Sequence, residues 1–138
     1  MAEEEAKKKK GPPFEVLPNK QIFPLMGFGT YKLQDELELT NLLRKGLQLG
    51  YCKHIDTARM YNNEIPLGKA IKTVIEEGRV KREELFIASK IFNCKYESVQ
   101  REVKEILQLM QLKYIDLLYI HWPFVDMDDS GEFNHKPI

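Results

Sequence analysis

Four titratable side chains in this 138-residue chain stand where predicted β-strands end. Asp56, Lys90 and His121 each close or follow a short apolar segment of strand length, and Tyr61 lies in the loop after Asp56. In proteins built from β-strands alternating with helices, the carboxyl ends of parallel strands meet at one edge, and ligands bind there. We therefore expect these four side chains to share one rim.

The four groups make chemical sense as a set. A free tyrosine has a pKa of about 10 and is a reluctant proton donor at neutral pH. An ammonium beside it stabilises the phenolate, and a carboxylate can orient that ammonium. A histidine can hydrogen-bond the same substrate oxygen. Such a site can protonate an alkoxide as it forms from a carbonyl, with the hydride supplied by a cofactor.

Each side chain also has a structural interpretation. Asp56 could cap a turn or helix, and Lys90 could extend to solvent from a strand end. Tyr61 could pack on the surface, and His121 could be a hydrogen-bonded core residue. Their convergence on one rim favours the functional interpretation. The other histidines are interpreted structurally: His54 packs at the start of a strand, and His135 lies in the terminal loop.

Hydrophobic spacing predicts the elements that position these groups. A β-hairpin is expected from segments 14–16 and 21–23 around the turn 17–20. Strands are expected at 25–30, 54–56, 85–88 and 114–120, and helices at 35–49, 64–77 and 97–110. Asp35 and Asn63 are the predicted helix caps, and Gly50 and Gly78 the predicted stops. From 124 to 138 the chain is polar and turn-rich, which predicts a loop leading to a further helix.

The strands recur at a spacing of about thirty residues, which is typical of the βα unit with parallel strands and right-handed crossovers. An open doubly wound sheet and a (β/α)8 barrel share this pattern. A barrel needs eight units and roughly 250 residues. Only four strands are predicted here, so we expect the chain to be truncated if it is a barrel.

Composition excludes several classes of partner. Lysine plus arginine and aspartate plus glutamate number 21 each, which gives no reason to expect nucleic acid or an anionic membrane as a partner. No segment approaches the ~20 apolar residues of a membrane helix. Residues 1–13 are expected to form a disordered charged tail, although Lys7 to Lys10 could serve in targeting or docking. The folded domain is then 14–138. Cys52 and Cys94 are expected to be free thiols, which favours a cytoplasmic location, and no metal site is expected.

Several motifs resemble those of the aldo-keto reductase family. Asp56 to Glu64, with the sequence DTARMYNNE, resembles the family signature D-T-A-x-x-Y-x-N-E, and Gly68 and Ala70 continue the match. The segment 120–123, IHWP, resembles a strand-end motif of the family. Lys90 stands where the family has its catalytic lysine, and 27–32 resembles G-x-G-T-W/Y. The resemblance covers about residues 14 to 125.

This resemblance implies the first four βα units of a (β/α)8 TIM barrel preceded by a β-hairpin, and NADPH-dependent reduction of aldehydes or ketones to alcohols. Tyr61 is implied as the general acid, tuned by Lys90 and Asp56, and His121 as the residue that orients the carbonyl. The residues implied to line the nicotinamide half of the cofactor are Gly29, Thr30, Tyr31 and Asp56. Those implied for the substrate pocket are Tyr31, Phe92 and Trp122.

Two departures from the family bear on these expectations. Tyr31 and Phe92 stand where members often have tryptophan, which implies an altered pocket, although Phe92 could also be ordinary aromatic core. The later strands, which hold the nicotinamide-stacking aromatic and the 2′-phosphate pocket in the family, have no counterparts in this chain. A non-catalytic half-barrel therefore stays open as an alternative. It could act as a binding subunit, as potassium-channel β subunits of this fold do, or self-associate through exposed sheet edges. An inactive truncated product is a further alternative.

Overall fold

The structure, a computed structural model of the chain, describes residues 13–50, 53–92, 96–122, 124–127 and 133–137, with side chains described to residue 122 except at 96 and 97. Most of the predicted tail, as well as Cys52 and Cys94, therefore lies outside the described residues. The elements in chain order are β1 (Phe14–Val16), β2 (Ile22–Pro24), β3 (Gly27–Gly29), α2 (Glu36–Leu49), β4 (His54–Asp56), the 3-10 turn η1 (Arg59–Tyr61), α3 (Glu64–Glu76), the 3-10 turn η2 (Arg82–Glu84), β5 (Phe86–Ile91), α4 (Tyr96–Met110), β6 (Leu117–Ile120), β7 (Phe124–Met127) and β8 (Phe133–Pro137).

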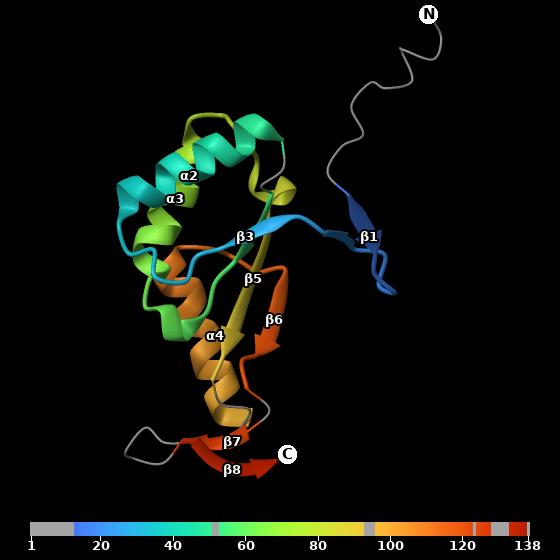
Figure 1. Cartoon of the computed structure of the whole chain (residues 1–138), viewed down its shortest axis with the longest axis vertical. Coiled ribbons are helices and arrows are strands. Elements are labelled where there is room, and N and C mark those ends of the chain that lie inside the picture. The colour runs from blue at the N-terminus through green and yellow to red at the C-terminus, as the bar shows by residue number, and fades with distance from the viewer. Residues whose placement is uncertain (1–12, 51–52, 93–95, 123, 128–132, 138) are drawn as a thin grey trace, which may run out of the picture.

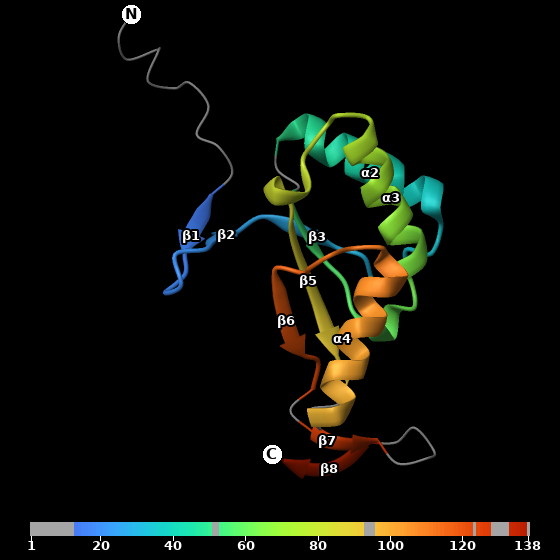
Figure 2. The same ribbon diagram turned by 180° about the vertical axis from the view of Figure 1, so that it is seen from behind.

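A four-stranded parallel sheet in the order β3-β4-β5-β6 forms the centre of the molecule, which confirms the predicted parallel βα arrangement. Figures 1 and 2 show that α2, α3 and α4 all cover the same face of this sheet, while the opposite face stays open. The strands are short, and β3 is shorter than predicted. β5 runs longer than predicted, to Ile91, so Lys90 lies within the strand and not after it.

The hydrophobic core fills the space between the sheet and the three helices. Its members are apolar residues of the helix stripes and the helix-facing side of the strands: Leu39, Leu43, Ile55, Leu67, Ala70, Ile71, Val74, Val80, Leu85, Ile87, Ile91, Ile106 and Met110. Gly68 lets α3 approach α4 closely, because a Cβ there would lie 2.4 Å from the backbone oxygen of Met110. The helix spacing seen in the sequence therefore corresponds to one continuous buried layer.

The ends of α2 match the predicted signals. The Asp35 side chain accepts a hydrogen bond from the backbone N–H of Glu38 at 2.8 Å, and Gly50 takes the left-handed conformation with φ 75°. Asn63 is the N-cap residue of α3, as predicted, and its carbonyl oxygen accepts the backbone N–H of Leu67 at 3.0 Å. Asn63 occupies the position before the helix, but its side chain makes no capping bond, because it is committed to other partners described below.

The N-terminal hairpin β1–β2 forms as predicted, with antiparallel pairing. It lies against the amino ends of the central strands. The ring of Phe23 packs edge-on against His54 and Phe86, each at 5.2 Å between ring centroids. Nδ1 of His54 lies 2.9 Å from the carbonyl oxygen of Pro24. The structural interpretation of His54 is thus confirmed.

The fourth strand is shorter than predicted, since Tyr114 to Asp116 lie outside β6. The Asp116 carboxylate accepts the backbone N–H of Ile87 at 2.9 Å and a guanidinium N–H of Arg82 at 2.8 Å. Arg82 also donates to the carbonyl oxygen of Tyr114 at 2.8 Å. These hydrogen bonds hold the segment just before β6 to Arg82 and Ile87.

The prediction of a plain loop from 124 onward is wrong. β7 and β8 form an antiparallel hairpin near the carboxyl ends of β5 and β6 (Figure 1). The described strands begin with Phe124 and Phe133, and the segment between them contains Gly131, so the sequence carries a hairpin signal alongside its polar turn residues. His135 belongs to β8 and not to a loop.

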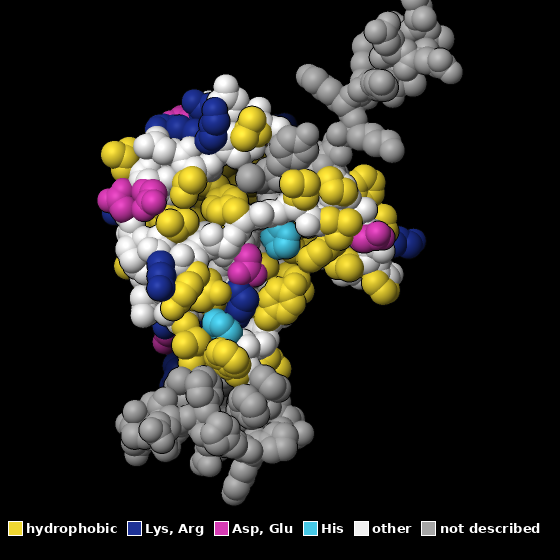
Figure 3. All heavy atoms as spheres, viewed as in Figure 1, with side chains coloured by type: hydrophobic (Ala, Val, Ile, Leu, Met, Phe, Trp, Pro, Cys, Tyr) yellow, Lys and Arg dark blue, Asp and Glu magenta, His cyan; other side chains and the backbone are white. Residues whose placement is uncertain are grey.

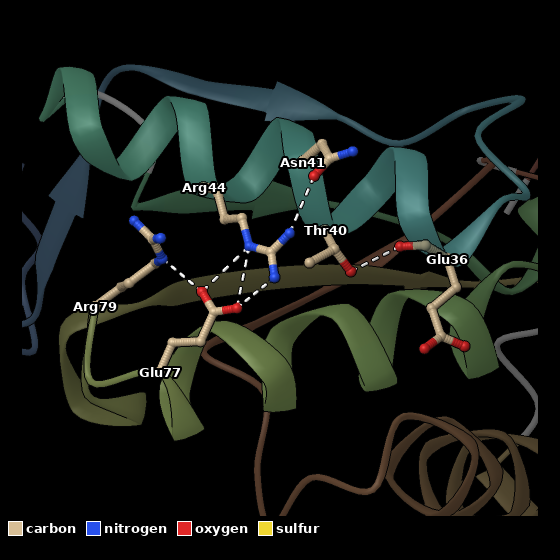
Figure 4. Close-up of polar contacts among 6 residues, drawn as sticks. All are labelled: Glu36, Thr40, Asn41, Arg44, Glu77 and Arg79. Carbon is tan, nitrogen blue, oxygen red and sulfur yellow. Dashed lines mark hydrogen bonds and ion pairs between the residues drawn. The ribbon is translucent and has the colours of Figure 1, made fainter.

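On the surface, α2 and α3 are joined by an ion-paired cluster. Arg44 of α2 donates to both carboxylate oxygens of Glu77, at the end of α3, and Arg79 donates to the same carboxylate (Figure 4). These hydrogen bonds, from Arg44 above all, lower the pKa of Glu77 to about 2. Within the part of the chain that the structure describes, no helix is long and apolar enough to cross a membrane.

Candidate active site

The predicted tetrad converges on the carboxyl ends of three neighbouring strands. Asp56 is the last residue of β4, Lys90 is the penultimate residue of β5, and His121 directly follows β6. Tyr61 ends the 3-10 turn η1, which follows β4. Figure 3 shows histidine, acidic and basic side chains close together among hydrophobic ones on the open face of the sheet.

The Lys90 ammonium is the centre of the site. It pairs with the Asp56 carboxylate, donates to the carbonyl oxygen of Thr57 at 3.0 Å and lies 3.3 Å from the hydroxyl oxygen of Tyr61. The Lys90 side chain is only 17% exposed, so water screens these interactions poorly. An ammonium has three N–H donors, and the three partners use all of them. The electrostatic arrangement therefore stabilises negative charge on the tyrosine oxygen.

Tyr61 is held by its local turn. Its backbone N–H donates to the carbonyl oxygen of Ala58 at 3.0 Å, and Asn62 closes the turn in the left-handed conformation with φ 51°. The Gln34 side chain donates to the carbonyl oxygen of Tyr61 at 2.6 Å. The backbone of Tyr61 is thus held from the loop that follows β3 as well as from within η1.

Two ion pairs brace the same turn. Arg59, in η1, donates to Glu64 at 2.6 Å and to Glu105 on α4 at 2.9 Å. The Glu64 side chain is only 3% exposed, whereas the Glu105 side chain is 43% exposed. Arg59 therefore ties η1 both to the start of α3 and to α4.

His121 faces the tyrosine from the far side of the site. Its ring centroid lies 5.9 Å from that of Tyr61, and it stacks on Trp122 at 5.6 Å with an interplanar angle of 7°. Its backbone N–H donates to the carbonyl oxygen of Ile91 at 2.9 Å, which continues the β5–β6 pairing. Burial, followed by the positive charge of Lys90, lowers the pKa of His121, while Asp56 opposes this shift. The neutral imidazole is favoured at pH 7.

The residues predicted for cofactor contact lie together beside Asp56. Gly29 is the register partner of Asp56 across β3 and β4, and a Cβ added to Gly29 would meet nothing within 4 Å. Thr30 is fully buried, and both its N–H and its hydroxyl donate to the carbonyl oxygen of Asp56. Tyr31 is 63% exposed, and its ring lies 5.0 Å from that of Tyr61. Thr30 therefore links the ends of β3 and β4, whereas Gly29 and Tyr31 leave accessible surface beside Asp56.

The residues predicted for the substrate pocket surround the histidine and the tyrosine. The Phe92 ring lies 6.1 Å from that of His121. Phe92 also lines a hollow of about 490 Å³ between η1 and α4, together with Arg59. The Glu102 carboxylate accepts the backbone N–H of Phe92 at 3.0 Å. Tyr31, Phe92 and Trp122 thus lie around the tetrad and not in the core.

Sequence reasoning missed the polar residues that hold the site in place. The sequence predicts Asn63 only as a helix cap and indicates no role for Thr57, Gln34 or Arg59. Asn63 and Thr57 occur within the nine-residue motif, so the motif is the signal that could have drawn attention to them. No spacing rule points to Gln34. Across the described residues, no group of three or more His, Cys, Asp or Glu side chains could hold a metal ion.

Tyrosine, lysine, aspartate and histidine thus meet at the carboxyl edge of a parallel βα sheet, which is where enzymes of this architecture have their active sites. The model of the aldo/keto reductase family matches residues 25–133. The chain belongs to that family.

Individual relatives agree with this assignment. The chain is 40% identical over 109 residues to aldose reductase of Encephalitozoon cuniculi, a match that covers 79% of this chain and 36% of the relative. It is 39% identical over 107 residues to human aldo-keto reductase family 1 member A1, covering 75% of this chain and 32% of the relative. The chain thus spans about a third of the length of these relatives.

A solved structure supports the fold. The chain resembles the crystal structure of Bombyx mori aldo-keto reductase in complex with NADP, with a TM-score of 0.79 and 29% sequence identity. The superposition covers 94% of this chain and 44% of that one. The sheet and its helices therefore correspond to part of an aldo-keto reductase barrel.

Proposed function

We propose that this site reduces aldehydes or ketones to alcohols, with NADPH as the hydride donor and Tyr61 as the general acid. The observation that carries the proposal is the Lys90 ammonium, which contacts the Asp56 carboxylate and the Tyr61 hydroxyl at once. In this arrangement the tyrosine can donate its proton to the substrate oxygen, because the phenolate left behind faces a fixed positive charge.

The residues around the tetrad fit the nicotinamide half of the cofactor. A Cβ added at Gly29 would meet nothing within 4 Å, which leaves space next to Asp56 for the nicotinamide, and Tyr31 provides an exposed aromatic side chain beside it. Gly29, Thr30, Tyr31 and Asp56 would hold this half. When bound, NADPH supplies the hydride, which no side chain can provide. The relatives extend well beyond the matched region, and we propose that the remaining cofactor contacts come from that part of the fold.

The side chains of this chain then have distinct tasks. The neutral imidazole of His121 hydrogen-bonds the carbonyl oxygen of the substrate and orients it toward Tyr61. Tyr61 donates its hydroxyl proton to that oxygen as negative charge develops there. Lys90 stabilises the resulting phenolate, and Asp56 keeps the ammonium in place. Phe92 and Trp122 exclude water and select the substituents of the carbonyl.

The test compares Tyr61→Phe with the matched variant Tyr114→Phe, whose ring packs on Arg82 away from the site. NADPH oxidation with a reactive aromatic aldehyde is measured for the chain itself. It is also measured for the chain joined to the part of the Bombyx mori aldo-keto reductase that lies beyond the matched region.

In the joined form we expect turnover that falls by about 10²- to 10⁴-fold in Tyr61→Phe, the usual contribution of a general acid, and is unchanged in Tyr114→Phe. Turnover by the chain itself would show how much of the reaction the described elements support. A folded joined form without turnover, or equal rates for the parent and Tyr61→Phe, would overturn the proposal.

A further inference from the structure

The side chain of Asn63 joins three separate segments beneath the site. It is fully buried, and its Nδ2 donates to the carbonyl oxygens of Thr30 at 2.8 Å and Leu33 at 2.9 Å. Its Oδ1 accepts the hydroxyl of Thr57 at 3.0 Å. Two carbonyls can only accept and the amide nitrogen can only donate, so these neighbours fix the orientation of the amide. Asn63 is thus a satisfied buried polar group.

The first consequence concerns Thr57. This residue is fully buried, its backbone N–H donates to the carbonyl oxygen of Ala88 at 2.9 Å, and its hydroxyl is held by Asn63. The peptide group that follows cannot rotate freely, because the residue is held on both sides. Its carbonyl oxygen is the acceptor that lies 3.0 Å from Nζ of Lys90. Asn63 therefore sets the direction of one of the three acceptors around the ammonium.

The direction of the Thr57 carbonyl in turn affects the contact between Lys90 and Tyr61. Two of its donors are taken by the Asp56 carboxylate and the Thr57 carbonyl, which leaves the third for the Tyr61 hydroxyl at 3.3 Å. The three N–H bonds of an ammonium have a fixed tetrahedral geometry. A displaced Thr57 carbonyl would therefore re-aim the donor that faces the tyrosine.

The second consequence concerns the tyrosine itself. Asn63 holds the carbonyl oxygen of Leu33, and the next residue, Gln34, donates to the carbonyl oxygen of Tyr61 at 2.6 Å. The same buried amide thus fixes the loop that anchors the tyrosine turn. Asn63 acts on both partners of the contact, on Lys90 through Thr57 and on Tyr61 through Gln34.

We propose that Asn63 is a positioning residue that sets the contact between the Lys90 ammonium and the Tyr61 hydroxyl by holding Thr57 and the Leu33–Gln34 segment. Its importance for turnover rests on the proposed function. The geometric claim does not, because the contact can be measured in the chain without cofactor or substrate.

The experiment follows the Cζ signal of Tyr61 by NMR at neutral pH in the whole 138-residue chain labelled with ¹³C at Cζ of tyrosine. Tyr61→Phe identifies the signal. The charged and titratable groups facing Tyr61 are Lys90 from β5, Asp56 from β4, His121 after β6 and Tyr31 after β3. None of these is altered in the variants.

Thr57→Val removes the hydroxyl with little change of shape, and Thr57→Ser keeps it. Thr40→Val is the matched control, because it removes another buried hydroxyl, one that bonds within α2 (Figure 4). Asn63→Ala removes the whole brace. The double variant Asn63→Ala/Thr57→Val tests whether the two side chains act through each other.

Displacing the Lys90 ammonium changes the surroundings of the Tyr61 hydroxyl, and we expect the Tyr61 Cζ signal to move in Thr57→Val. Thr57→Ser and Thr40→Val are expected to match the parent. The double variant is expected to shift no further than Asn63→Ala. An unchanged Tyr61 signal in Thr57→Val, or equal shifts in Thr57→Val and Thr40→Val, would overturn the proposal.

The outcomes also separate this inference from the proposed function. A shift in Thr57→Val together with a reductase rate that is insensitive to Tyr61→Phe would support the positioning role and refute the catalytic one. The reverse pattern would refute the positioning role and leave the catalytic one standing.

Discussion

The pair between Arg59 and Glu64 gives the sharpest stability prediction. Glu64 is 3% exposed at the side chain, and it accepts a hydrogen bond at 2.6 Å from Arg59, which is 25% exposed. Arg59→Met keeps the length of the side chain but leaves a buried carboxylate without its counter-charge. Removing one partner of a buried pair costs about 3–5 kcal/mol, and the partial exposure of Arg59 places the loss at the lower end, about 3 kcal/mol.

The assay is urea unfolding of the chain followed by circular dichroism. With a slope of about 2 kcal/mol per molar urea, a loss of about 3 kcal/mol lowers the midpoint by about 1.5 M. The control is Glu105→Gln, which breaks the other pair of Arg59. Glu105 is 43% exposed, so that loss should be at most about 1 kcal/mol.

A second substitution isolates the cause. Adding Glu64→Met to Arg59→Met removes the buried charge, and we expect most of the lost stability to return, because an apolar pair can replace a buried ion pair. If Arg59→Met costs no more than Glu105→Gln, or if Glu64→Met restores nothing, the buried ion pair does not brace the tyrosine turn as described.

Three further predictions concern packing and pH. Gly68→Ala should destabilise the chain by about 1–3 kcal/mol in urea unfolding, because its Cβ would meet the α4 backbone. Gly29→Ala should cost far less, because nothing lies within 4 Å of a Cβ there. Equal losses of stability in the two variants would contradict this packing. Glu77, whose pKa is lowered to about 2 chiefly by Arg44, contributes stability above its ordinary pKa of about 4.5 that is lost as the pH falls from there to about 2. The Glu77→Gln variant should lack this loss of stability between those pH values, and an acid unfolding profile identical to that of the parent would refute the prediction. The proton NMR signals of His121 should titrate with a midpoint below 6.5, and a midpoint at or above that value would show that burial does not control the ring.

Periodic and local signals made much of the fold predictable. The alternation of short apolar runs with helix stripes was enough for the parallel sheet, because each helix must return the chain to the same end. The cap at Asp35 and the stop at Gly50 were predictable since each depends only on residues in one turn. The hairpin after residue 123 was not predicted, because its polar residues match a loop equally well.

The candidate site was predictable for a different reason. Strand ends can be located from sequence, and the carboxyl edge brings their residues together, so Asp56, Lys90 and His121 could be assigned to one rim. The hydrogen bonds of Asn63 beneath these residues could not be predicted from the sequence. Asn63 has the sequence context of a helix cap, and only the fold brings the carbonyl oxygens of Thr30 and Leu33 within reach of its amide. Contacts between distant segments carry no periodic signal.

In the proposed reaction, hydride from NADPH and a proton from Tyr61 together convert a carbonyl to an alcohol. The most direct measurement supplies NADPH deuterated at C4 of the nicotinamide, on the face that is transferred, to the joined form with an aromatic aldehyde, and analyses the alcohol by mass spectrometry. We expect an alcohol that carries one deuterium, formed about 10²- to 10⁴-fold more slowly by Tyr61→Phe. An alcohol without deuterium, or one formed equally fast by Tyr61→Phe, would contradict the proposed reaction.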